Sequence, residues 1–116
     1  AYINQYLRIA SIHGKMCNSF PSTSDNPTAE QIESINSIRN AITDKRMQYE
    51  WPASAFNKQG KVTATVVGGN LRCIENLMGT GFALRAADCI LLLEDVEEPL
   101  YNIDRMFWNL YHTGVL

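Results

Sequence analysis

The chain has 116 residues, of which 46% are hydrophobic and 19% are charged, and its formal net charge at pH 7 is −2. This composition predicts one globular domain over residues 1–116, and it gives no basic surface of the kind that nucleic-acid binding needs. Three cysteines without a Cys-x-x-Cys pair favour a reducing compartment, and no apolar run approaches the ~20 residues of a membrane span. We therefore expect neither nucleic acid nor membrane as a partner.

The first half of the chain carries signals for strands and for one helix. Residues 7–13, 47–51 and 61–67 have the alternation or apolar content that predicts strands. Thr28 is a predicted N-cap with Gln31 at the capping-box position. Isoleucines then recur at helical spacing and predict a helix of roughly four turns: Ile32, Ile35, Ile38 and Ile42.

After residue 67, strand and helix signals alternate. Asn70 can cap a short helix, which the segment Gly79-Thr80-Gly81 would end. The continuous apolar run 89–93 predicts a strand covered on both faces. Pro99 precedes a helix with one apolar face: Ile103, Met106, Phe107, Leu110 and Tyr111. Together these signals predict an α/β fold, a mixed β-sheet with flanking helices.

The Gly68-Gly69-Asn70 triplet is a candidate substrate-side turn. Glycines between a strand and a helix can bring backbone N–H groups close to an anion at the helix start. The triplet lacks the third glycine of a dinucleotide fingerprint, and a plain tight turn between strand and helix is the favoured interpretation.

Glu94 is the candidate catalytic residue. It follows the Leu-rich run, and the carboxyl end of a core strand is where open α/β sheets place functional groups. The alternative is an acidic lead-in to the next helix, whose positive dipole end Asp95, Glu97 and Glu98 would complement.

Other reactive side chains lack the neighbours that chemistry would need. His13 and His112 have no partner at metal-ligand spacing, so we predict structural roles and no metal site. Cys17, Cys73 and Cys89 are predicted to be core or loop thiols.

Five segments, in order and at family-like spacing, resemble the LD-carboxypeptidases: residues 67–71, 77–80, 90–96, 101–106 and 109–116. Residues 13–16 resemble the family's His-Gly-Pro-Met segment, with Lys15 in place of proline. A glycine that is common in the family's acidic segment is Glu97 here. These proteins, also called muramoyl-tetrapeptide carboxypeptidases, are serine peptidases of the S66 type that trim D-alanine from murein tetrapeptides.

The resemblance implies that the chain is most of the C-terminal, swivelling-type domain of a larger two-domain enzyme. The family's triad is Ser-His-Glu, and Glu94 matches the glutamate, whose role would be to accept the imidazole N–H. The serine is expected in an N-terminal domain before residue 1 and the histidine after residue 116. We therefore expect the chain to be inactive by itself and the enzyme to need no metal or organic cofactor.

The implied reaction releases terminal D-alanine from a murein peptide during cytoplasmic cell-wall recycling in bacteria. The expected partners are that substrate and the N-terminal domain. An end at Leu116 should expose apolar surface and strand edges, which favours a homodimer or exchange of elements between copies. Two alternatives stay open: an immunity peptidase of the same family that cleaves peptide-nucleotide conjugates, and a noncatalytic binding or assembly module.

Overall fold

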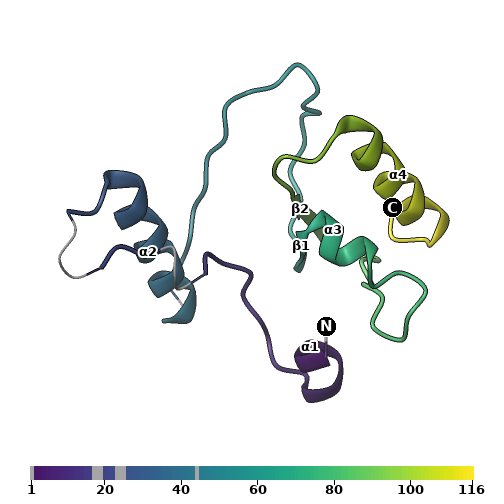
Figure 1. Cartoon of the computed structure of the whole chain (residues 1–116), viewed down its shortest axis with the longest axis horizontal. Helices are drawn as coiled ribbons and strands as arrows, with labels where there is room; N and C mark the ends of the chain where they lie inside the picture. Colours follow the sequence, from purple (N-terminus) through teal and green to yellow (C-terminus); the bar gives the residue numbers. More distant parts are fainter. Residues whose placement is uncertain (1, 17–19, 23–25, 44) are drawn as a thin grey trace. The chain divides into compact units, whose positions relative to one another are not determined.

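The computed structural model describes residues 2–16, 20–22, 26–43 and 45–116. Its elements, in chain order, are α1 (Tyr2–Leu7), α2 (Ala29–Ile42), β1 (Val66–Asn70), α3 (Leu71–Glu75), β2 (Ile90–Glu94) and α4 (Leu100–His112) (Figure 1). The coordinates divide into two compact units. One contains Gly60–Leu116 and the residues up to Ser11, and the other is Ile12–Gln59. The expectation of one domain over residues 1–116 stays a prediction.

The sheet of the described residues consists of β1 and β2, which pair in parallel from Val66↔Ile90 to Asn70↔Glu94. Parallel neighbours need a crossover, and the segment that contains α3 provides it. The structure thus confirms the α/β class and the flanking helices. The sheet found is parallel, however, and not mixed, because the other two predicted strands did not form within the described part of the chain.

Gly68 and Gly69 lie in β1, and the helix begins directly after Asn70. A Cβ on Gly68 would stand 1.8 Å from the carbonyl oxygen of Leu92 on the paired strand, and the φ of Gly68 is +147°. Only glycine permits this approach of the two backbones. The triplet therefore ends a strand, where the sequence interpretation placed a turn.

The core lies between the sheet and the two helices that follow the strands. Its buried side chains are Leu71, Ile74, Met106 and Leu110, with exposed fractions of 6% or less. The predicted amphipathic helix is confirmed as α4, but its buried stripe is narrower than expected. Phe107 is 40% exposed and Tyr111 is 62% exposed.

The two faces of β2 differ. Leu93 packs against the core, whereas Leu92 is 51% exposed. Because successive strand residues point to opposite faces, Leu92 and Glu94 share the face away from the core. The prediction of a strand covered on both faces is wrong for the described residues, since α3 and α4 cover one face only.

Helix α2 forms as predicted. The backbone N–H of Gln31 donates to Thr28 Oγ1 at 3.2 Å, and the N–H of Thr28 donates to Gln31 Oε1 at 2.8 Å. This reciprocal pair is the expected capping box. None of the helix's residues is buried, and Ile42 is 70% exposed. The isoleucine stripe therefore exists without a closed core around it in the described residues.

The predicted strands over residues 7–13 and 47–51 are wrong. Helix α1 occupies Tyr2–Leu7, Arg8 has a left-handed φ of 53°, and the rest of residues 8–16 forms no regular element. Residues 47–51 are exposed, with Tyr49 and Trp51 stacked. Among the described residues, neither segment has a neighbouring strand to accept its backbone hydrogen bonds, so alternation alone does not produce a strand. The prediction over 61–67 holds only for its end, since β1 begins at Val66.

No helix within the described ranges combines the length and the apolar character that crossing a membrane requires.

Candidate functional site

Glu94 is the last residue of β2 and pairs with Asn70, the last residue of β1. Its side chain is exposed. It occupies the uncovered face of the sheet, together with the half-exposed Leu92. The structure therefore places the predicted carboxylate at the carboxyl edge of a parallel sheet, where α/β proteins place functional groups.

Asn70 joins this carboxylate to α3. Its Oδ1 accepts a hydrogen bond from the backbone N–H of Cys73 at 3.0 Å, which caps the helix. Its Nδ2 donates to Glu94 Oε2 at 3.4 Å, near the long limit for such a bond. One amide thus serves the helix through its oxygen and the carboxylate through its nitrogen.

Asp95 supplies the anion at the start of α3. Its Oδ2 accepts from the N–H of Arg72 at 3.1 Å, and its Oδ1 accepts from the N–H of Val96 at 2.9 Å. Asp95 and Asn70 thus accept hydrogen bonds from two of the first backbone N–H groups of α3, those of Arg72 and Cys73. An outside anion at this end would have to displace Asp95, so the structure favours a plain strand–helix junction at Gly68-Gly69-Asn70.

Glu98 is held by Arg72. The guanidinium donates from Nε to Oε1 at 3.2 Å and from Nη2 to Oε2 at 3.0 Å. Asn102 Nδ2 adds a bond to Oε2 at 2.9 Å. The Arg72 side chain is 38% exposed and that of Glu98 is 19% exposed, so the pair is only partly shielded from water. The segment after Glu94 is therefore attached to α3 at both Asp95 and Glu98.

These contacts divide the acidic cluster by role. Glu98 directly precedes Pro99, the N-cap of α4, and bonds to Asn102 in its first turn, as the lead-in interpretation expects. Asp95 instead satisfies α3. Glu97 has a left-handed φ of 63°, a backbone conformation that favours glycine.

Arg72 was missed by the sequence interpretation. A cation in the first turn of a helix is unfavourable next to the positive dipole end, so it signals a carboxylate partner. That partner lies 26 residues away, and only the parallel crossover brings it close.

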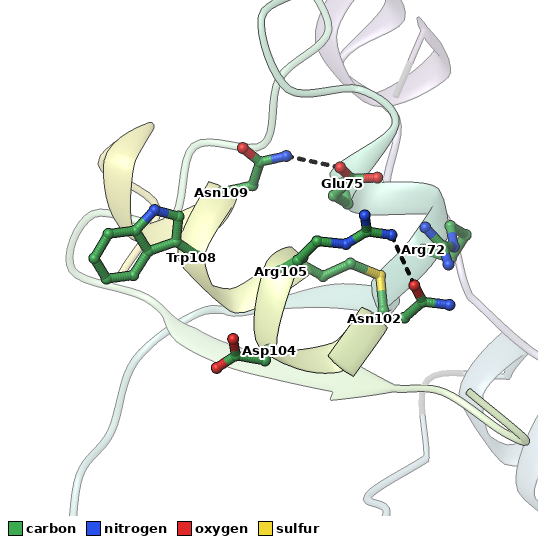
Figure 2. A pocket seen from close by; sticks show the side chains of 8 residues that line it. Arg72, Glu75, Asn102, Asp104, Arg105, Trp108 and Asn109 are labelled. Atoms are coloured by element: carbon green, nitrogen blue, oxygen red, sulfur yellow. Dashed lines mark hydrogen bonds between the residues drawn. The ribbon is translucent and has the colours of Figure 1, made fainter. Parts of the chain in front are cut away.

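A pocket of about 550 Å³ lies along α3 and α4. Figure 2 shows its side chains, including Arg72 and Trp108. Asn109 donates to Glu75 at 2.7 Å, and Arg105 donates to Asn102 at 2.9 Å. None of the site residues predicted from the sequence lines this pocket. The Arg72 guanidinium, which also lines the pocket, binds Glu98 outside it.

None of the histidines and cysteines of the described residues lines this pocket. His112 packs edge-on against Trp108, with ring centroids 4.5 Å apart. Cys73 is an exposed thiol and Cys89 a partly buried one, and both are free. Cys17 lies outside the described residues. Within the described ranges, no three His, Cys, Asp or Glu side chains are grouped to hold a metal ion.

Comparison with known proteins identifies relatives. Residues 63–116 match the family described as LD-carboxypeptidase C-terminal domain. The chain is 31% identical to a murein tetrapeptide carboxypeptidase of Pseudomonas aeruginosa over 111 residues, which is 90% of this chain and 35% of that protein. A Bacillus subtilis relative, whose name includes murein peptide carboxypeptidase, is 39% identical over 57 residues, or 49% of this chain and 18% of its own.

A third relative, from Vibrio cholerae, also has a carboxypeptidase name and is 35% identical over 68 residues, 57% of this chain and 19% of its own. The chain thus spans about a third of the Pseudomonas protein and under a fifth of the other two. No solved structure matches it. The family match covers β1 through α4, including Glu94 and the core. Residues 63–116 thus match the LD-carboxypeptidase C-terminal domain family.

Proposed function

We propose that the protein containing this chain is a serine LD-carboxypeptidase that removes terminal D-alanine from murein tetrapeptides, and that Glu94 is the acidic member of its triad. One observation carries the proposal. Glu94 is an accessible carboxylate at the carboxyl end of β2, inside the segment that matches the family. The names of the Pseudomonas and Bacillus relatives, both murein carboxypeptidases, support the substrate class.

In this mechanism, Glu94 accepts a hydrogen bond from one N–H of a histidine that another part of the parent protein supplies. This bond fixes the tautomer in which the other ring nitrogen takes the proton from a serine hydroxyl as it attacks the scissile carbonyl. The carboxylate also stabilises the imidazolium that forms. The histidine then returns its proton to the departing amine of D-alanine, and water hydrolyses the acyl-enzyme by the same route.

The exposure of Glu94 fits this role. A carboxylate that must receive a histidine from elsewhere has to be reachable. The uncovered sheet face beside it is apolar at Leu92 and Val66, which are 51% and 58% exposed. Covering this face would remove water from the carboxylate and strengthen its bond to the imidazole.

We place the reaction in cytoplasmic murein recycling, without a metal or organic cofactor. The parent's partners would be its murein peptide substrate and the N-terminal domain that supplies the serine. Copies of this chain would associate as a homodimer through the apolar surface that it exposes.

The test is an assay of D-alanine release. The full-length parent is incubated with murein tetrapeptide, and free D-alanine is quantified against a reaction with the 116-residue chain alone. We expect release by the parent and none by the chain. Release by the isolated chain would contradict the division of the triad. A parent that cleaves a peptide-nucleotide conjugate and leaves the tetrapeptide intact would replace the murein assignment with the immunity alternative.

A further inference from the structure

We infer that Asn70 is a positioning residue that fixes the direction of the Glu94 carboxylate. The inference rests on the proposed function of Glu94, and it gives Asn70 a role in catalysis without contact to the substrate. The observation behind it is that the same side chain caps α3 and donates to Glu94.

The orientation of the amide is determined by the helix. An asparagine side chain can be turned by 180° with almost no change in shape, so a neighbour must decide which end is the oxygen. Here the backbone N–H of Cys73 can only donate, and it stands 3.0 Å from Oδ1. This places Nδ2, with its two hydrogens, on the side of Glu94 Oε2.

The backbone that carries the Asn70 side chain is held in place by its neighbours. Asn70 and Glu94 are paired through the parallel ladder, so their backbones are fixed relative to each other. The next residue, Leu71, is 3% exposed and belongs to the core. The residue after Glu94 is also tied down, because Asp95 accepts from the N–H of Arg72.

The Glu94 side chain still has its own torsions, and an exposed glutamate samples several rotamers. A donor on Oε2 selects the rotamers that reach it and so limits the directions in which the carboxylate can meet a histidine. Misplacing a catalytic group by about 1 Å can cost ~10²-fold in rate, so such a constraint has a measurable effect.

Asn70→Asp in the full-length parent is the sharpest test. Aspartate keeps an oxygen for the Cys73 N–H and is as good an N-cap as asparagine, but it replaces the donor to Glu94 with a second acceptor. We expect kcat for D-alanine release to fall about 10- to 100-fold, with KM within about twofold. This is the range found for residues that orient the side chains binding a metal ion. Asn70→Ser keeps a cap and removes the donor without adding charge, so its kcat should fall less.

Glu94→Gln, measured beside them, distinguishes a failure of the positioning role of Asn70 from a failure of the proposed function of Glu94. If Glu94→Gln is inactive while both Asn70 variants keep the parent's kcat, the positioning role is overturned and the proposed function stands. A raised KM with unchanged kcat would also overturn it, because Asn70 would then contact the substrate. Full activity in Glu94→Gln would overturn the proposed function itself. Thermal unfolding is recorded for each variant, and if Asn70→Asp is unfolded, the kcat of Asn70→Ser decides.

Discussion

The two units of the chain reach order by different means. In the unit that contains Gly60–Leu116, four side chains are buried, and they come from α3 and α4. In the unit Ile12–Gln59, α2 begins with a complete capping box but has no buried residue. Local hydrogen bonds thus mark where α2 begins, whereas a core needs elements that are distant in sequence. The candidate site lies in the unit with the core.

The match to known proteins follows the same division. The family match begins at residue 63, just before β1, and contains Asn70, which donates to Glu94, and Arg72, which donates to Asp95. Ile12–Gln59 lies outside it, although the alignment with the Pseudomonas relative covers 111 residues. The buried core and the position of Glu94 therefore depend on contacts between the same elements, which are distant in sequence.

The largest effect should come from the core. Leu110→Ala removes a side chain that is 0% exposed and leaves a cavity, so we expect about 3 kcal/mol of lost unfolding free energy for this unit. Ile38→Ala in the partly buried stripe of α2 is the matched control and should cost less than about 1 kcal/mol. Urea unfolding with amide exchange in both helices measures the two. Equal losses would abolish the contrast between the units.

The Arg72–Glu98 pair should contribute less than the core. Glu98→Gln and Arg72→Gln, alone and combined, form a double-mutant cycle. We expect a coupling free energy of about 1 kcal/mol, because the contact has three hydrogen bonds but Arg72 is 38% exposed to water. Chemical denaturation gives the four values. Zero coupling would mean that the attachment at Asp95 alone holds the segment after Glu94.

The capping box tests the locally determined unit. Thr28→Ala removes the acceptor for the Gln31 N–H and should cost α2 about 1 kcal/mol. Far-UV circular dichroism and amide exchange in α2 report the loss, while exchange in α4 should stay unchanged. Ser34→Ala, in the middle of α2, is the control and should not reduce helicity. Loss of protection in α4 as well would show that the two units fold together.

Glu97→Gly should have the smallest effect on the unfolding free energy, and it should raise that free energy where the other variants lower it. The left-handed φ of 63° strains glutamate by about 1 kcal/mol, and glycine relieves this strain but adds freedom to the unfolded chain. We expect a net gain of about 0.5 kcal/mol in the thermal unfolding of the parent. Glu97→Ala removes the same charge without relieving the strain and should bring no gain. If alanine stabilises equally, charge is the cause.

The sequence predicted the features that depend on neighbours along the chain. The Thr28 capping box and the Asn70 cap are local and were confirmed, and the apolar stripe of α4 was confirmed except at the exposed Phe107 and Tyr111. The alternation at residues 7–13 misled because a strand also needs a partner, which the sequence does not show. The pairing of Asn70 with Glu94 and the bond from Arg72 to Glu98 depend on the strand register, so neither could be predicted from spacing.

The central claim is that Glu94 serves a histidine and not merely the helix that follows it. Glu94→Gln in the full-length parent measures this directly when compared with Glu97→Gln, a nearby exposed acid changed in the same way. We predict that D-alanine release by Glu94→Gln falls about 10²- to 10⁴-fold, as expected when a triad acid becomes an amide, while Glu97→Gln stays within about twofold of the parent. Release by Glu94→Gln at the rate of Glu97→Gln would contradict the account.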